Sequence, residues 1–425
     1  MNRTGDYTRG KLKLGVFGNF YPSPSRLGPH TTGLVMQLAE SERVESILLF
    51  TTNAARCPGL KVIPKLQFDH CWEHEDPLSL LRALMKMLRA MRRVDAYLFN
   101  VFMTSFGRSR VANALGLGLP AIVSILSRKP VVVYMHNSTH SEDFELLGYH
   151  PSRFTLCFLD LLFWLLGRTT SLVFPLPSQS RAFTNEVGVP ARSLFLPYVE
   201  GLPILVALEG SMVGRMKSAQ APKQALRRIL LFGSWGPQKD FESVDRLVTR
   251  LDHSQVAYQL IIAGSVNPNF PNSERKLLEL ARRLPANKSA LELGLSDGEL
   301  GILLLGTDVL CLPYRASGGS SGVMNLGAFF GVPMVATDLP QLRECASLLN
   351  TPVTFFELGD PDAFGNAVLE TLATESNSPS SSRANPVMRA QSMQTSVDRL
   401  ITLIVGSRNH GGVAQPSQPS EEPVS

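Results

Sequence analysis

The residues best suited to hold an anion lie in a stretch rich in glycine and serine, which runs from 313 to 323 and reads PYRASGGSSGV. It joins a strong strand pattern to an apolar helical pattern, so it predicts a loop at a helix start. Backbone N–H groups there can form a nest around a phosphate, and serine hydroxyls add donors. Ser321, Gly322 and Val323 are the candidate ligands, with Arg315 as a nearby cation. A flexible loop is the alternative interpretation.

A second turn, from 231 to 240, reads LFGSWGPQKD and again joins a strand pattern to a helical pattern. Gly233 lets the backbone approach a ligand, and Lys239 near the helix start offers a compact cation to a diphosphate. A solvated surface lysine is the alternative interpretation.

The first half of the chain offers two candidates after strand patterns. The loop from 18 to 30 reads GNFYPSPSRLGPH, and Gly28 and Pro29 precede a helical pattern whose start could bind a phosphate or hydroxyl. An ordinary strand-to-helix turn is the alternative. His136 ends a buried run, at the edge where open α/β sheets collect ligands, and could contact a sugar or orient an acceptor. A structural histidine bonded to a backbone carbonyl is the alternative.

Other kinds of chemistry are not indicated. The chain has no Walker A sequence, no GxGxxG after its first strand pattern, and no pair of carboxylates whose spacing indicates glycoside hydrolysis. Its five cysteines are scattered without metal-ligand spacing. We therefore expect no metal and no cofactor, and a reducing, cytoplasmic setting.

Alternating strands and helices must position these residues. Apolar runs separated by helical patterns predict parallel βαβ units. The runs begin at Leu14, Ser46, Ala96, Pro130, Ser171, Arg228, Tyr258, Asp308 and Pro333. The alternation stops near 203 and restarts near 226, which predicts an α/β fold with two Rossmann-like domains. The expected bounds are a flexible N-terminus at 1–10, a first domain at 11–202, a linker at 203–225, a second domain at 226–376, a break and C-terminal helix at 377–405, and a disordered tail at 406–425.

Length and composition agree with two ordered domains. A chain of 425 residues is too long for one ordinary hydrophobic core. A composition of 44% hydrophobic and 18% charged residues is typical of a globular protein. A net charge of +5 favours phosphate or an anionic membrane surface, without indicating nucleic-acid binding. The N-terminus lacks a signal-peptide pattern, and the longest apolar stretch, 154–167, is shorter than the roughly 20 residues of a membrane span.

Peripheral membrane contact is one interpretation of two segments. Residues 80–93, LLRALMKMLRAMRR, form a basic amphipathic pattern, and 154–167 is strongly apolar. Such helices can lie in a membrane interface, here at its cytoplasmic face. Packing of both segments on the sheet is the alternative.

These segments together resemble the retaining glycosyltransferases of family 4, whose two Rossmann-like domains face each other across a cleft in the arrangement called GT-B. The resemblance runs from about Lys11 to Ile404. It is most specific between 294 and 338, where GLSDGEL, TDVLCLP, GSSGV and GVPMVATD follow one another in the order of the family's donor half.

The resemblance implies roles for single residues. Lys239 falls on a lysine that binds the diphosphate, Gly322 and Val323 on a loop whose amides hold phosphate, Leu295 near a base pocket, Gly28 and Pro29 on an N-terminal glycine loop, and His136 on an active-site histidine. The chain departs from the pattern at three positions. Ser234 stands where the family has an arginine, and Gly318 and Leu326 stand where it has two glutamates, the second of which holds ribose. Arg315 is a candidate to replace the missing positive charge.

The function that the resemblance implies is transfer of a hexose from a nucleotide diphosphate sugar to a glycan or lipid-linked acceptor, with retention at the anomeric carbon. Lys239 and the loop amides would stabilise the diphosphate as it leaves, without a metal. A catalytically silent GT-B-like subunit that supports a partner enzyme is the alternative, because the glutamates are missing. A sugar-nucleotide epimerase is a further possibility, and it would need no acceptor.

Overall fold

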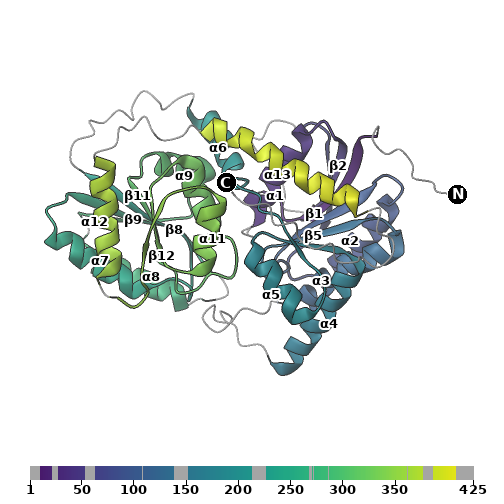
Figure 1. Ribbon diagram of the computed structural model, residues 1–425, viewed down its shortest axis with the longest axis horizontal. Coiled ribbons are helices and arrows are strands. Elements are labelled where there is room, and N and C mark those ends of the chain that lie inside the picture. Colours follow the sequence, from purple (N-terminus) through teal and green to yellow (C-terminus); the bar gives the residue numbers. More distant parts are fainter. Residues whose placement is uncertain are drawn as a thin grey trace, which may run out of the picture.

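The computed structural model describes residues 10–21, 27–52, 63–107, 109–137, 152–212, 226–267, 270, 272–285, 287–360, 362–376 and 386–407. These residues form two α/β halves (Figure 1). Residues 1–9 of the N-terminus predicted to be flexible lie outside the described residues, and so do residues 408–425 of the tail predicted to be disordered. Residues 377–385 of the predicted break also lie outside them.

The N-terminal half is a parallel sheet of seven strands with helices on both faces. In spatial order the strands are β3 (Leu66–Trp72), β2 (Val44–Thr52), β1 (Leu12–Gly18), β4 (Ala96–Val101), β5 (Val131–Met135), β6 (Ser171–Phe174) and β7 (Arg192–Ser193). One face packs against α2 (Pro77–Ala90), α3 (Arg110–Ser127), α4 (Arg153–Thr169) and α5 (Pro177–Val187). The other face packs against α1 (Leu27–Glu40) and α13 (Pro386–Gly406).

The C-terminal half repeats this plan with six parallel strands. Their order is β10 (Ser289–Leu293), β9 (Tyr258–Val266), β8 (Arg227–Trp235), β11 (Val309–Leu312), β12 (Met334–Thr337) and β13 (Val353–Phe356). One face packs against α9 (Asp297–Leu305), α10 (Gly322–Phe330) and α11 (Pro340–Leu348). The other packs against α7 (Phe241–His253), α8 (Asn272–Arg283) and α12 (Ala363–Ser376). The predicted fold class, two parallel α/β sheets of Rossmann type, is therefore confirmed.

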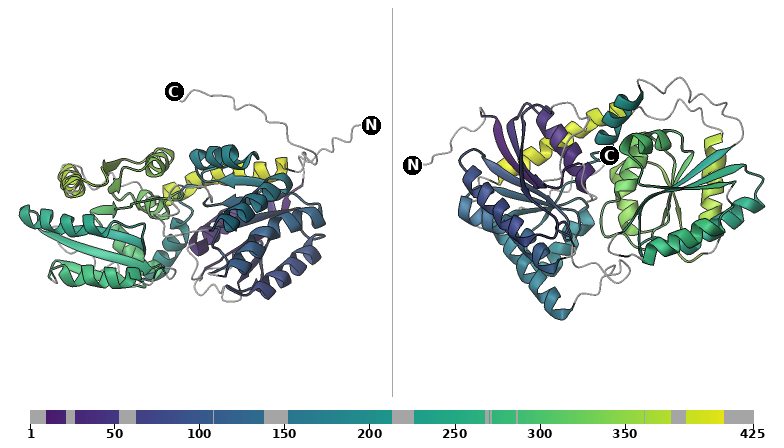
Figure 2. Two further views of the ribbon diagram at one scale, coloured as in Figure 1. Left: turned by 90° about the horizontal axis from the view of Figure 1, so that it is seen from below. Right: turned by 180° about the vertical axis from the view of Figure 1, so that it is seen from behind.

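Two helices connect the halves. The segment predicted as a linker, 203–225, begins with all but the first two residues of α6 (Gly201–Met212), a helix that packs against both α1 and α9. Residues 213–225 lie outside the described residues. At the other end of the chain, α13 returns from the C-terminal half and buries Val397 and Ile401 in the N-terminal core (Figure 2). Each half therefore contributes a helix to the packing of the other.

The strand order fixes where a ligand can bind. Both sheets reverse their order beside the first strand, between β1 and β4 and between β8 and β11. At such a reversal the two flanking helices lie on opposite faces of the sheet, so a crevice opens beyond the carboxyl ends of the strands. The loops after these four strands are thus the expected positions of ligand-binding residues.

The carboxyl end of β8 depends on a glycine in the neighbouring strand β9. Gly264 in β9 pairs with Gly233 in β8, has a φ of +120°, and a Cβ added there would lie 2.0 Å from the carbonyl oxygen of Gly233. We expect Gly264→Ala to lower the free energy of unfolding by about 3 kcal/mol or more, from positive φ and overpacking together. Gly188→Ala, at a φ of +70° with no atom within 4 Å, is expected to cost only about 1 kcal/mol. Urea unfolding of both variants measures the difference, and equal costs would contradict this interpretation.

Candidate functional site

A buried lysine marks the reversal point of the C-terminal sheet. Lys239 is 2% exposed, and its Nζ donates a hydrogen bond to the carbonyl oxygen of Phe232 at 3.2 Å. The ammonium lies 3.9 Å from the centroid of the Tyr314 ring, and the two residues form an antiparallel bridge between the loops after β8 and β11. The turn that the sequence singles out therefore holds a desolvated positive charge at the carboxyl ends of both strands.

Gly233 and Val323 lie beside this lysine. A Cβ added to Gly233 would lie 3.7 Å from the Lys239 Nζ and 3.0 Å from the Val323 Cγ2. The structure thus brings together three of the predicted site residues, from β8, the following turn and the start of α10. A side chain at Gly233 would occupy the space between them.

The glycine- and serine-rich loop ends at the start of α10, as the sequence predicts. Ser321 is the N-cap, and its hydroxyl accepts a hydrogen bond from the Met324 amide at 3.2 Å. The amides of Gly322 and Val323 belong to the first turn, where a helix offers no backbone acceptor, and the positive end of the helix dipole lies there. This helix start, next to Lys239, can bind a phosphate group.

The two remaining donor-half candidates lie further out. The guanidinium of Arg315 is 3.4 Å from the Asp240 carboxylate and 3.8 Å from that of Glu242, so acidic side chains at the start of α7 already share its charge. Leu295 follows β10, two strands along from β8, and is half-buried against the core cluster on the α9 side of the sheet.

His136 lies at the carboxyl end of β5 in a buried polar network. Its Nε2 donates to the Asn100 Oδ1 at 2.8 Å, because an amide oxygen can only accept. The Asn100 Nδ2 in turn donates to the Thr31 Oγ1 at 2.8 Å and to the His30 Nδ1 at 3.2 Å. Thr31 and His30 belong to the first turns of α1, which begins at Leu27. The prediction that Gly28 and Pro29 precede this helix is therefore wrong, because both lie within its first turn. The network therefore joins β4, β5 and α1 at the reversal point of the N-terminal sheet.

Burial keeps both imidazoles neutral. It lowers the pKa of His30 to about 3. It also lowers the pKa of His136 well below the usual value, with the neighbouring His30 as a second cause. His136 can thus donate or accept hydrogen bonds at neutral pH without carrying a charge.

The loop before α10 touches the N-terminal half. A Cβ added to Gly319 would lie 2.4 Å from the carbonyl oxygen of His136. Gln179, in α5, donates from its Nε2 to the carbonyl oxygens of Gly318 at 3.0 Å and His136 at 3.4 Å. His136 and the loop that precedes the phosphate-binding amides therefore lie on facing sides of one interface.

Glu200 is a site residue that the sequence does not single out. It immediately precedes α6, and its Oε1 lies 3.6 Å from the position of a Cβ added to Gly322. Its Oε2 is buried and has no hydrogen-bond partner among the described residues. Burial raises the pKa of this carboxyl to about 7. A carboxyl group with a pKa near neutral pH thus lies beside the start of α10.

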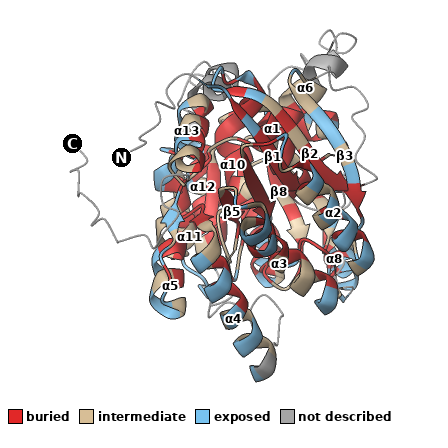
Figure 3. Cartoon of the chain, turned by 90° about the vertical axis from the view of Figure 1, so that its right-hand side faces the viewer, coloured by how far each residue is buried: buried red, intermediate tan, exposed pale blue. Residues whose placement is uncertain are grey.

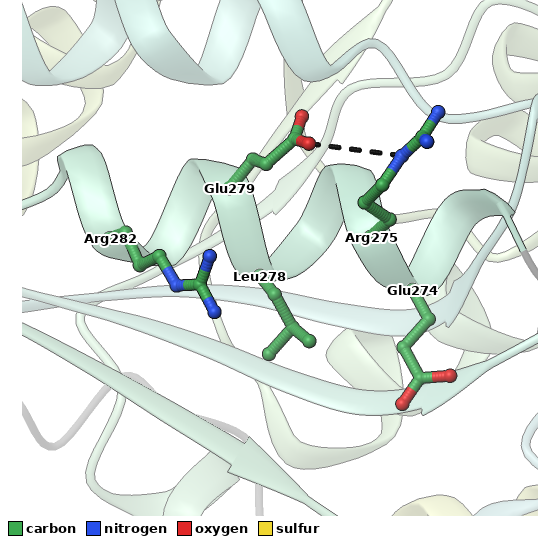
Figure 4. A pocket seen from close by; sticks show the side chains of 5 residues that line it. All are labelled: Glu274, Arg275, Leu278, Glu279 and Arg282. Carbon is green, nitrogen blue, oxygen red and sulfur yellow. Dashed lines mark ion pairs between the residues drawn. The ribbon is translucent and has the colours of Figure 1, made fainter.

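A hollow on the outer side of α8 is a different kind of feature. Its lining comes from that single helix, with the ion pair between Arg275 and Glu279 at 3.8 Å (Figure 4). The flanking charged side chains are those of Glu274 and Arg282. It contains no buried polar group, so we assign no ligand to it.

Comparison with solved structures identifies the arrangement of the two halves. HepE from Anabaena, solved in complex with UDP and glucose, matches with a TM-score of 0.60 over 93% of this chain and 100% of its own, at 14% identity. This is the GT-B fold. Sucrose-phosphate synthase from Thermosynechococcus elongatus, also a GT-B glycosyltransferase, matches with a TM-score of 0.60 over 93% of this chain and 99% of its own, at 13% identity.

The same GT-B likeness extends to an enzyme of another class. UDP-GlcNAc 2-epimerase from Neisseria meningitidis, bound to UDP-GlcNAc, matches with a TM-score of 0.56 over 93% of this chain and 100% of its own, at 10% identity. No family model and no curated protein matches the sequence. The GT-B fold is therefore shown, while the reaction must be argued from the site.

Proposed function

We propose that this GT-B protein is a retaining glycosyltransferase, which moves a hexose from a nucleotide diphosphate sugar to a glycan or lipid-linked acceptor. The observation that carries the proposal is the buried Lys239 between Gly233 and Tyr314, beside the first turn of α10. Likeness to HepE, which was solved with UDP and with glucose, supports a nucleotide-sugar donor.

In this proposal, the protein acts mainly on the leaving group. Negative charge develops on the diphosphate as the glycosidic bond opens, and Lys239 with the amides of Gly322 and Val323 stabilises it in a site of low dielectric constant. These groups supply the positive charge themselves, so the proposal includes no metal and no cofactor. Neutral His136 would position the sugar or the acceptor from the N-terminal half. Closure of the cleft would exclude water, which competes as an acceptor.

A cytoplasmic location is part of the proposal. Its support is that the described cysteines, Cys71, Cys157, Cys311 and Cys345, are all free thiols.

A thermal-shift screen against UDP-, GDP-, ADP- and dTDP-sugars tests donor binding, since a ligand of the native state raises the unfolding temperature. We expect one donor to stabilise the protein selectively, and the release of its nucleoside diphosphate to require an acceptor. Binding without release under any acceptor would favour the silent subunit, and conversion of the sugar without an acceptor would favour an epimerase. No shift with any donor would overturn the proposal.

A further inference from the structure

The exposed large apolar side chains concentrate on three helices of the N-terminal half. Nineteen such side chains are exposed among the described residues, and eleven of them belong to α2, α3 and α4. They are Leu78, Leu81, Met85, Val111, Ile122, Ile125, Leu126, Phe158, Leu161, Trp164 and Leu165. The three helices pack side by side, α3 in the middle, and each presents an exposed side (Figures 1 and 3). We call this surface the α2–α4 face.

The middle helix is apolar on both sides. Towards the sheet, α3 buries Leu117 and Val123, while Ile122 and Ile125 are 37% and 55% exposed. By length and composition α3 could cross a membrane, the one such helix among the described residues. In this fold, however, it connects β4 to β5 and lies against the sheet, so only its outer side is open to another apolar partner.

The same three helices and their ends are rich in basic side chains. Residues 77–93, 110–129 and 152–170 contain ten lysines and arginines and one acidic residue, Asp160. Eight of the ten are exposed arginines: Arg82, Arg89, Arg92, Arg93, Arg110, Arg128, Arg153 and Arg168. Guanidinium groups bind phosphates in a bidentate manner, and apolar side chains between them can enter the acyl region of a bilayer.

We propose that the α2–α4 face docks on a bilayer that contains anionic phospholipids. A second copy of the chain, related by a two-fold axis, would bring this basic face against itself, whereas lipid phosphates complement its charge. Insertion of the apolar side chains and pairing of the arginines then act together, as in other interfacial helices.

Docking on this face also bears on the acceptor. In the chain, α3 and α4 follow β4 and β5, and Asn100 and His136 lie at the carboxyl ends of these two strands. The site would thus open near the lipid surface, which favours a lipid-linked acceptor; this step rests on the proposed transferase function. The docking itself requires no donor, so the two proposals can fail separately.

Tryptophan fluorescence of the full chain provides the test. Of its three tryptophans, Trp72 and Trp235 are fully buried and Trp164, on the α2–α4 face, is 44% exposed. Without any donor, we expect vesicles of phosphatidylcholine and phosphatidylglycerol to shift the emission to the blue and to carry the protein on flotation. Pure phosphatidylcholine vesicles, or high salt, should bind it much less.

Matched variants separate docking from loss of the fold. Leu161→Asp, at a side chain 63% exposed in α4, should weaken vesicle binding about tenfold or more. Leu278→Asp, at a side chain 37% exposed in α8, should bind as the wild type does. Failure of the wild type to bind anionic vesicles, or unchanged binding by Leu161→Asp, would overturn the proposal. The proposal would also be overturned if the wild type formed a dimer and bound no vesicles, and if Leu161→Asp made it monomeric.

Discussion

Replacement of Lys239 by methionine is expected to lower kcat/KM for the nucleotide-sugar donor by about 10²–10³-fold, the usual effect of removing one preorganised group that faces developing negative charge. Lys239 is 2% exposed and lies over the Tyr314 ring, so water cannot replace its charge without rearrangement. Methionine keeps an unbranched stem of similar length, and the packing between Gly233 and Val323 should survive. Steady-state release of the nucleoside diphosphate measures the change.

Lys288→Met is the matched control for this prediction. Lys288 also lies over a tyrosine ring, 5.2 Å from the Tyr258 centroid, and it pairs with Asp252 at 2.6 Å. It immediately precedes β10 and so lies at the amino ends of the strands of the same sheet, whereas Lys239 lies at their carboxyl ends. We expect its variant to keep wild-type kcat/KM. If Lys239→Met, folded by circular dichroism, stayed within about threefold of the wild type, the assigned role of Lys239 would be wrong.

The sequence indicates the inner strands of both sheets and misses the edges. The nine apolar runs correspond to β1, β2, β4, β5, β6, β8, β9, β11 and β12, while the four unrecognised strands, β3, β7, β10 and β13, are the outermost ones. An inner parallel strand is covered on both faces and reads as a continuous apolar run. An edge strand has less cover, and β3 accordingly mixes exposed Gln67 and His70 with buried Cys71.

The site could be predicted where its chemistry is local to one turn. Gly233, Lys239 and Val323 come from strand-to-helix turns, whose composition is visible in the sequence, and the structure brings them close together. Asn100 and His30 escape notice because they act through partners 36 to 70 residues away. An amide at the end of a fully buried strand is the signal that could have indicated Asn100.

The resemblance implies glutamates at the positions of Gly318 and Leu326, and the structure shows what these two residues contact instead. Gly319, in the same loop, approaches the carbonyl oxygen of His136 so closely that a Cβ would lie 2.4 Å from it, and Gly318 accepts from Gln179. The loop therefore uses backbone contacts to reach the N-terminal half. Leu326 is 7% exposed and belongs to the apolar cluster of α9 to α11, so its side chain packs in the core. Glu200, from a different segment, places a carboxyl group near the start of α10.

Glu200→Gln is expected to remove a pH dependence of stability. Burial raises the pKa of Glu200 in the folded protein to about 7, above the ordinary value of 4.5 for this carboxyl. Below pH 4.5 the carboxyl is protonated in both states, and between pH 4.5 and 7 only the unfolded state releases the proton. Stability therefore falls as the pH rises through this window, by about 3 kcal/mol. Urea unfolding should show Glu200→Gln more stable than the wild type at pH 8 and equal to it at pH 4.5. An unchanged difference across this range would contradict the assignment.

Ionisation of Glu200 is also expected to weaken donor binding. Its Oε1 lies 3.6 Å from the Cβ position of Gly322, so the carboxylate would repel a diphosphate held by the first turn of α10. The diphosphate of a nucleotide sugar keeps its charge between pH 6 and 8, and the change in affinity must therefore come from the protein. We expect the Kd of the wild type to rise about tenfold over this range, and that of Glu200→Gln to stay constant. Calorimetry at both pH values measures this, with the exposed Glu279→Gln as a control that should follow the wild type.

By linkage, donor binding above pH 7 takes up a proton, which titrations in buffers of different ionisation enthalpy will detect. A pH-independent Kd in the wild type would mean that the diphosphate binds away from the start of α10.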